Sequence, residues 1–331
     1  MTSTLARQRR KAGPGAAALG AMALVLFLAW SNSFVAVSFL LGREGVEARF
    51  DWISLTVARF LPAAVVMAPY VLFFRCRESW TILKGHPVRL LVAGLLAVPS
   101  YNLALYYGQQ HGVPAPIASV TTTLAPLFLM VLSALFLGER LTWRRAGAFA
   151  VALTGVVLIG RAKQETPGDV PYSLSVLVLA LAPLSWSLYT VISKPLTGRV
   201  SSVLWTYLSV MVGTVPLLFV LPFRGGPEMA ALDATGWGAL LFLSLLCTVL
   251  GYALWMVLLR HLPASTLGFT VFLNPPLTTA SKWGLSLLLP AMFTFRVLPM
   301  EWVGGGVVLT GLLLAVMSRR TARLPARGEG G

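Results

Sequence analysis

The chain has 331 residues, of which 57% are hydrophobic and 11% are charged, and its mean hydropathy is +0.79. Soluble domains carry roughly 25% charged residues, so this composition excludes an ordinary soluble protein and indicates one embedded in a membrane. The net charge of +15 does not indicate a nucleic-acid partner, because long apolar runs separate the basic side chains instead of leaving them in one tract.

Ten apolar segments are candidates for helices that cross a bilayer, and a spanning helix takes about 20 residues. In chain order they are 16–41, 52–74, 90–109, 114–137, 146–160, 173–193, 202–222, 237–259, 263–289 and 302–318. A basic segment (1–15) precedes them, a linker (161–172) divides them, and the tail (319–331) has too little apolar content to fold alone. We therefore expect an all-α integral membrane protein with ten transmembrane helices.

The basic residues of the short loops predict the orientation of these helices. If the N-terminus is cytoplasmic, the cytoplasmic segments hold 18 Lys and Arg residues and the opposite side holds six. Cytoplasmic loops carry the excess of positive charge in membrane proteins. We therefore expect both termini in the cytoplasm and the chain in the plasma membrane, which is the inner membrane if the cell is bacterial.

The two halves of the chain resemble each other at nearly constant offsets. ALYYGQQHGVPAPIASVTTTLAP (104–126) aligns with ALWMVLLRHLPASTLGFTVFLNP (253–275) at an offset of 149 residues, and Trp30-Ser31 aligns with Trp186-Ser187 at an offset of 156. This pattern predicts two five-helix repeats, 16–160 and 173–318. Because five is odd, the second repeat is inverted relative to the first, as in many transporters that work by alternating access.

Three prolines interrupt expected spans at related places in the two repeats. Pro126 lies in the fourth span, and Pro275 and Pro276 lie in the ninth. Proline lacks the backbone donor and breaks the helical hydrogen-bond ladder one turn back. These positions are candidates for helix breaks with a role in gating, and the alternative is a packed kink that contacts no ligand.

Two charged residues, Arg59 and Lys282, lie within expected spans, about 10–12 Å from their outer ends at 1.5 Å per residue. Their side chains could reach towards water or make a structural hydrogen bond. The functional alternative is that they line an outward vestibule and attract an anionic group of a solute, such as a carboxylate or phosphate. No acidic residue lies deep in a span to neutralise them, and for the same reason no proton-coupling carboxylate can be named.

Aromatic and amide residues in mid-span are candidates for a substrate pocket, because small-molecule sites combine apolar walls with a few placed polar groups. Packing between helices is the alternative for the aromatic residues, and a bridge between helices is the alternative for the amides. Five other tryptophans at span ends (52, 80, 143, 237 and 302) fit interfacial anchors instead. The candidates are Trp30, Asn32, Tyr101, Asn102, Tyr106, Trp186, Tyr189, Trp255 and Asn274.

The segment LAPLFLMVLSALFLGERLTWRRAGAFAVALTGVVLIG (124–160) resembles the signature of the drug/metabolite transporter superfamily, in its ten-helix EamA-like branch. AWSNSFVAV (29–37) and ARFLPAA (58–64) resemble the first-span and second-span patterns of the same family. The chain departs from the pattern after the ninth span, where Phe293–Arg296 replaces the second Leu-Gly-Glu turn after seven extra residues. The resemblance implies movement of small organic solutes, often out of the cell, including amino acids, drugs, nucleosides and sugar phosphates.

Glu139 belongs to the Leu-Gly-Glu-Arg turn at the cytoplasmic end of the fourth span, beside Arg140. We expect a surface ion-pair corner there, with gating as the alternative. The chain has no nucleophile elbow, no His-Glu-x-x-His helix and no cysteine spacing for a metal, so we expect neither an enzyme nor a cofactor. The prediction is a secondary transporter of a small solute, and the alternative is a non-transporting scaffold or a lipid-handling membrane protein.

Overall fold

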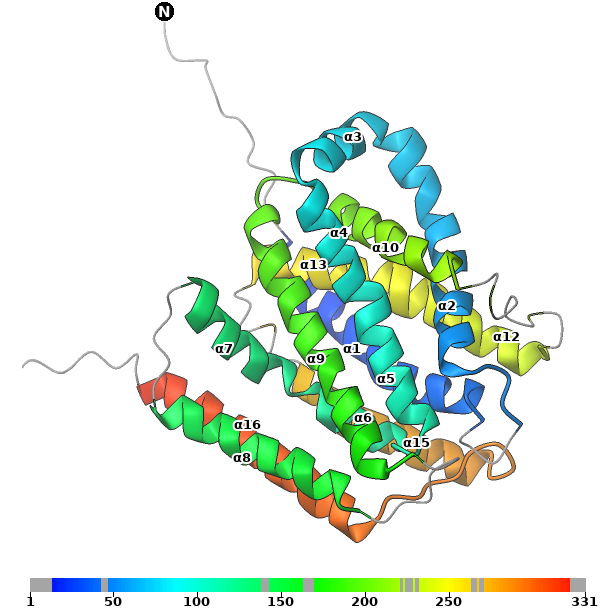
Figure 1. Cartoon of the computed structure of the whole chain (residues 1–331), viewed down its shortest axis with the longest axis vertical. Coiled ribbons are helices and arrows are strands. Elements are labelled where there is room, and N and C mark those ends of the chain that lie inside the picture. The colour runs from blue at the N-terminus through cyan, green and yellow to red at the C-terminus, as the bar shows by residue number, and fades with distance from the viewer. Residues whose placement is uncertain are drawn as a thin grey trace, which may run out of the picture.

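The computed structural model describes residues 14–42, 47–137, 143–162, 170–220, 232–262 and 271–321, together with residues 223, 229 and 267. Within these ranges the chain consists of helices and their connections and contains no β-strand (Figure 1). Glu139 lies outside the described residues, so the corner expected around it stays a prediction.

Among the described residues, five helical segments are long and apolar enough to cross a membrane, and they coincide with the first, second, third, sixth and eighth expected spans. The first is α1 (Ala16–Leu40), and the second is α2 (Trp52–Pro69) with a π-helical turn (Tyr70–Phe74). The other three are α4 (Pro87–Leu95) with α5 (Tyr101–Gln110), α9 (Tyr172–Ser193) with a 3₁₀ turn (Lys194–Leu196), and α12 (Ala234–Leu241) with α13 (Gly251–His261).

Two of these long helices contain a π-helical stretch at related positions. One stretch (Leu96–Ser100) joins α4 to α5, and the other (Phe242–Leu250) joins α12 to α13. At the repeat offset of 149 residues, the first stretch aligns with positions inside the second. A π-helical turn leaves backbone carbonyls outside the regular hydrogen-bond ladder, which is why such turns occur frequently at functional sites.

Over their described residues, the helices of the other expected spans do not combine the same length and apolar composition, so membrane crossing by all ten segments stays a prediction. The fourth span is divided into α6 (Ala115–Thr122) and α7 (Ala125–Leu137), and Pro126 lies in the first turn of α7. In the ninth span a 3₁₀ turn (Val271–Leu273) leads into α15 (Asn274–Leu288), whose first turn holds Pro275 and Pro276. The helices of the other three spans are α8 (Trp143–Gly160), α10 (Ser202–Leu218) and α16 (Pro299–Thr321).

The last helices of the two predicted repeats, α8 and α16, lie side by side along one edge of the molecule (Figure 1). Glycines allow their backbones to touch. A Cβ atom added to Gly155 would lie 2.6 Å from the carbonyl oxygen of Gly304, and one added to Gly311 would lie 2.7 Å from that of Ala148. Small residues of this kind give membrane helices their van der Waals contact, since lipid provides no hydrophobic force between them.

Two interhelical hydrogen bonds in the bundle interior are related by the repeat offsets. The hydroxyl of Ser31 in α1 donates to Oδ1 of Asn274 at 3.0 Å, and the hydroxyl of Ser187 in α9 donates to the carbonyl oxygen of Ala125 at 2.9 Å. The two serines are 156 residues apart, and their two acceptors are 149 residues apart. The bundle is therefore consistent with a two-repeat membrane fold in which the first helix of each repeat contacts the fourth helix of the other.

An ion pair joins the connection after α1 to the start of α12. Arg49 Nη2 lies 3.1 Å from Oδ2 of Asp233, which also caps α12 by accepting from the backbone nitrogen of Gly236 at 2.8 Å. The Thr235 hydroxyl, Arg49 and the Gly236 amide, in that order of effect, lower the pKa of Asp233 to about 2. An unfolded Asp has a pKa of about 3.9.

The Asp233 carboxylate therefore stabilises the folded chain at neutral pH. Its contribution is fully present above about pH 4 and is lost as the pH falls through about 2, because the folded pKa lies below the unfolded one. We expect the melting temperatures of the wild type and of Asp233→Asn to differ by a constant amount from pH 7 to about pH 4 and to converge below it. Thermal unfolding in detergent across this range measures the difference, and a gap that widens on acidification would contradict the assignment.

Candidate functional site

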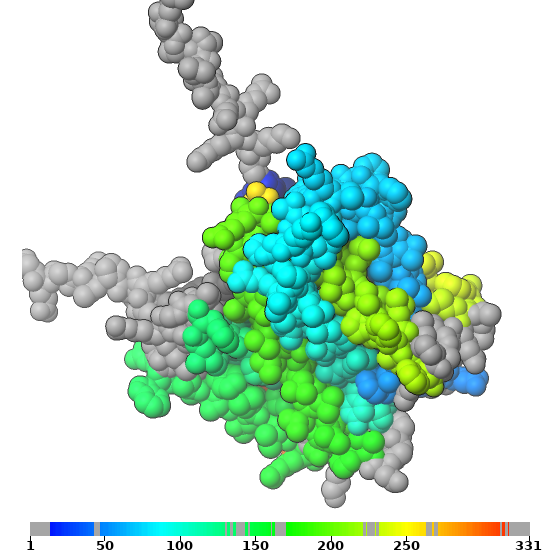
Figure 2. Space-filling model, turned by 45° about the horizontal axis from the view of Figure 1, so that its top comes forward, coloured from blue at the N-terminus to red at the C-terminus, as the bar shows by residue number. Residues whose placement is uncertain are grey.

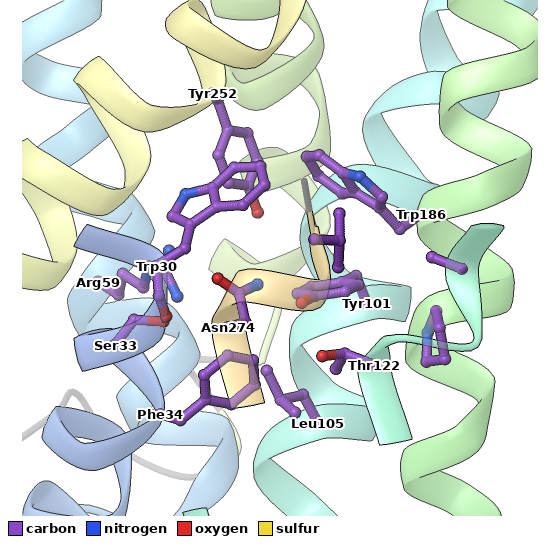
Figure 3. Close-up of a pocket in the computed structure, with 13 residues that line it drawn as sticks. Trp30, Ser33, Phe34, Arg59, Tyr101, Leu105, Thr122, Trp186, Tyr252 and Asn274 are labelled. Atoms are coloured by element: carbon purple, nitrogen blue, oxygen red, sulfur yellow. The ribbon is translucent and has the colours of Figure 1, made fainter. Parts of the chain in front are cut away.

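A cavity lies among helices of both repeats (Figure 3). Seven of the ten expected spans contribute to its wall, so it occupies the middle of the bundle. The lining residues are Trp30, Ser33, Phe34, Arg59, Tyr101, Leu105, Thr122, Ala125, Pro183, Trp186, Tyr252, Val271 and Asn274.

Aromatic rings close one end of this cavity. The ring of Trp30 lies 5.4 Å from that of Trp186 at an angle of 87°, and 5.5 Å from that of Trp255. Tyr252 packs edge-on against both Trp30 and Trp186. Figure 3 shows Trp30, Trp186 and Tyr252 at this end and Phe34 and Leu105 at the other. Edge-to-face contacts of this kind are directional, so the rings form an ordered wall.

The orientation of Trp30 depends on the π-helical stretch of the eighth span. Its indole Nε1 donates to the carbonyl oxygen of Cys247 at 3.1 Å, and that residue lies within the stretch Phe242–Leu250. Gly251 directly follows the stretch and leaves room for the indole, because an added Cβ atom would lie 2.6 Å from Nε1. The wall therefore requires glycine at this position.

Replacing Gly251 by alanine is expected to displace the Trp30 indole and break its hydrogen bond to Cys247, at a cost of about 1–3 kcal/mol. We expect a lower transport rate and a changed near-ultraviolet circular dichroism spectrum, since Trp30 contacts several other rings. Gly284→Ala is the matched control, because nothing lies within 4 Å of the added atom. Equal spectra and rates for the two variants would show that the orientation of Trp30 does not depend on the space left by Gly251.

Arg59 is the charged residue of the cavity wall, and its side chain is only 4% exposed. Its Nε donates to the Thr248 hydroxyl at 2.8 Å, and its Nη1 donates to Oδ1 of Asn102 at 3.3 Å and to the Tyr106 hydroxyl. All three acceptors are neutral, and no carboxylate among the described residues pairs with Arg59. The described residues also offer its Nη2 no acceptor, so the guanidinium retains both charge and a donor beside the cavity.

One partner of Arg59, Asn102, is itself held by the π-helical stretch of the third span, and so is the wall residue Tyr252. Asn102 Nδ2 donates to the carbonyl oxygen of Val98 at 2.8 Å, which turns its Oδ1 towards Arg59. The Tyr252 hydroxyl donates to the carbonyl oxygen of Ala97 at 3.1 Å. The structural hydrogen bonds considered for Arg59 are therefore present, and they orient the guanidinium towards the cavity.

The structure places the predicted site residues in three positions. Five of them line the cavity: Trp30, Arg59, Tyr101, Trp186 and Asn274. Four lie directly behind the wall: Asn102 and Tyr106 contact Arg59, while Tyr189 and Trp255 pack against Trp186. Two lie elsewhere: Asn32 donates to the carbonyl oxygen of Leu28 in its own helix, and Lys282 is buried in α15, two turns beyond Asn274 and outside the lining.

Several wall residues carry no clear signal in the sequence. Tyr252 adjoins the repeated Ala-Leu pair at 253–254 and lies in mid-span, so the criterion that selected Tyr101 could have found it. The remaining residues are small or apolar, and such residues occur on every face of membrane helices. They are Ser33, Phe34, Leu105, Thr122, Ala125, Pro183 and Val271.

Comparisons with known proteins agree with this architecture. A chain from a crystal structure is 18% identical and superposes with a TM-score of 0.61 over 94% of this chain and 100% of its own, which shows a shared fold. The probable terminal-alkyne amino-acid exporter of Streptantibioticus cattleyicolor is 30% identical, over 92% of this chain and 97% of its own. The probable amino-acid metabolite efflux pump of Escherichia coli is 23% identical, over 91% of this chain and 95% of its own.

The model of the EamA-like transporter family matches the chain twice, over residues 21–161 and 173–317. The two matches follow each other along the chain and together cover most of it. They agree with a multi-pass membrane protein built of two related halves around a central cavity. The chain belongs to the EamA-like transporter family.

Proposed function

We propose that the protein exports an amino acid or a closely related zwitterion by alternating access through the central cavity. The observation that supports this proposal most strongly is Arg59, a buried guanidinium without a carboxylate partner among the described residues, in a wall otherwise made of aromatic, apolar and neutral polar groups. A buried cation needs an anion or water as its partner. Relatives named as an amino-acid exporter and as amino-acid metabolite efflux pumps give the same substrate class.

The cavity offers a separate partner for each part of an amino acid. The planar guanidinium of Arg59 binds the carboxylate through charge-assisted hydrogen bonds. The faces of Trp30, Trp186 and Tyr101 attract the ammonium group by cation–π interaction. Asn274 adds an amide at the centre of Figure 3, and Phe34 and Leu105 offer apolar contact for a side chain.

Alternating access follows from the relation between the two repeats. With both termini in the cytoplasm, α13 runs towards the cytoplasm, so the Trp30, Trp186 and Trp255 rings close the cytoplasmic end of the cavity. The paired bonds of Ser31 and Ser187 cross between repeats beside Pro126 and Pro275, where the helices are interrupted. Movement of one repeat against the other exchanges the open and closed ends, with Glu139 at the cytoplasmic corner of the fourth span.

The test is solute counterflow in liposomes that contain the purified full-length protein. Labelled amino acids, polyamines, nucleosides and sugar phosphates are offered in parallel, with and without a pH gradient. We expect saturable exchange of an amino acid, and weak exchange of its amide, which lacks the carboxylate. Exchange of polyamines alone would overturn the role of Arg59, and the absence of flux from folded protein would favour a non-transporting membrane component.

Lys282 provides a separate test of where the substrate anion binds. If Lys282 contacts the anion during the transport cycle, Lys282→Ala should raise KM about tenfold, the effect of losing one charge-assisted hydrogen bond. The same assay on Lys282→Arg should restore most of the affinity, because the charge is kept. Unchanged KM in Lys282→Ala would leave Arg59 as the anion partner and give Lys282 a structural role in α15.

A further inference from the structure

A second cavity lies on the outside of the helix bundle, away from the central site. It runs between the end of the second span, the short helix α3 (Cys76–Gly85) and α10, and we call it the α3 groove. Its wall is almost entirely apolar. The lining residues are Val71, Leu72, Cys76, Ser79, Trp80, Leu83, Leu208, Met211, Val212 and Val215.

The shape of the α3 groove is fixed by the fold, because buried contacts hold α3 over the end of the second span. The Ser79 hydroxyl lies 3.0 Å from the carbonyl oxygen of Val71 and 2.9 Å from that of Arg75. Ile82 is buried beside it, while Trp80 remains 59% exposed. Along α10 the groove extends from Leu208 to Val215, a length of about 10 Å at 1.5 Å per residue.

The rim of the α3 groove is basic. The ammonium group of Lys84 lies 5.0 Å from the ring of Trp80, a residue of the groove wall. Residues 75–89 contain four basic side chains and one acidic side chain, a net charge of +3. Glu78 pairs with Arg75 at 2.7 Å, while Arg77 and Lys84 form no ion pair among the described residues. Figure 2 shows α3, in light blue, projecting beside α10, in yellow-green.

We propose that the α3 groove binds one acyl chain of an anionic phospholipid whose headgroup lies against Lys84 and Arg77. The combination of an apolar trough, an exposed tryptophan and a basic rim matches the three zones of such a lipid: acyl chain, interface and phosphate. A polar transport substrate would gain no binding free energy from the apolar walls. A zwitterionic lipid would gain less binding free energy from the basic rim than an anionic one. The site is independent of the central cavity and of the solute that is transported.

Cys76 gives a direct probe of this occupancy, because it lines the groove and is exposed, while Cys247 is buried. The rate of Cys76 alkylation by N-ethylmaleimide is measured on the full chain in detergent micelles supplemented with phosphatidylglycerol or with phosphatidylcholine of the same acyl chains. We expect phosphatidylglycerol to slow the reaction about fivefold for each basic side chain engaged, and phosphatidylcholine to slow it much less. Arg77→Gln with Lys84→Gln should abolish the difference between the two lipids.

A matched control separates binding from the general effect of a negative micelle on thiol reactivity. Leu177→Cys in a Cys76→Ser background places the thiol at a 63% exposed position of α9, a helix without basic residues. Phosphatidylglycerol should not protect this thiol. Val212→Trp, which fills the groove, should make Cys76 alkylation insensitive to lipid, and thermal unfolding checks that each variant is folded.

Three outcomes would overturn the proposal. Equal protection of Cys76 and of the thiol introduced by Leu177→Cys would show a general charge effect. Equal protection by both lipids would show that the rim does not select the headgroup. Protection that rises with protein concentration in the absence of added lipid would show that a second copy of the chain covers the groove.

Discussion

Arg59→Met is expected to raise the KM for an amino acid about 30-fold, since a hydrogen bond to a charged group contributes about 2 kcal/mol and each 1.4 kcal/mol is a factor of ten. Methionine keeps most of the volume and removes the charge. Arg59→Lys should recover part of the affinity, because a lysine keeps the charge but lacks the planar fork that binds a carboxylate through two hydrogen bonds.

The comparison of an amino acid with its amide distinguishes a binding role from a structural one. The wild type should prefer the amino acid, and Arg59→Met should lose that preference while still exchanging both solutes slowly. The ratio is measured within one variant, so it does not depend on how much protein folds. This matters because Thr248, Asn102 and Tyr106 lose their common donor when Arg59 is replaced. A preference that survives the substitution would place the anion site elsewhere.

The expected spans and the repeat offsets could be obtained from the sequence because they depend on properties averaged over many residues. Hydropathy located the five long helices to within a few residues, as for 52–74 and 173–193. The offsets of 149 and 156 also relate the Ser31 and Ser187 contacts, which no local pattern predicts. Those contacts form because the two repeats face each other. The alignment of the two halves had already paired the residues that make them.

The division between wall residues and supporting residues could not be obtained in the same way. Tyr101 lines the cavity, whereas the adjacent Asn102 points away and holds Arg59. In a soluble helix the polar face would indicate the direction of each side chain. Membrane helices are apolar all round, and the π-helical stretch before Tyr101 changes the angular position of every residue after it.

Two connections also differ from what their composition indicates. The segment 75–89 is polar enough to be taken as a loop, yet it contains α3, which becomes regular by burying Ser79 and Ile82 against its neighbours. The segment that replaces the second Leu-Gly-Glu turn packs on the bundle through Phe293, whose ring stacks on Phe39 at 5.4 Å.

The sequence also does not indicate that Glu301 is buried. The expected tenth span begins at residue 302, whereas α16 begins at Pro299 and includes Glu301. The Tyr172 hydroxyl and the backbone nitrogen of Leu298 donate to its carboxylate. The carboxylate therefore joins the start of α16 to the start of α9, a long-range contact that span composition does not reveal.

Gly213→Ala is expected to destabilise the folded protein by about 3 kcal/mol, the upper part of the range for overpacking a tight contact. Its α10 backbone touches α4: an added Cβ atom would lie 2.7 Å from the carbonyl carbon of Gly94 and 2.9 Å from Cβ of Val98. The first atom belongs to the helical backbone and the second is bonded directly to it, so neither can move without displacing the π-helical stretch that leads to Tyr101. We therefore expect transport to fall together with the melting temperature, measured by thermal unfolding in detergent.

The sign of this effect separates helix packing from helix propensity. In an exposed helix, replacing glycine by alanine stabilises the chain by about 1 kcal/mol. Gly238→Ala in α12 is the control, because nothing lies within 4 Å of the added atom, and it should leave the melting temperature unchanged or raise it. If Gly213→Ala behaved like Gly238→Ala, α4 and α10 would not be in backbone contact. Contacts other than the one between α4 and α10 would then have to hold Tyr101 in the cavity wall.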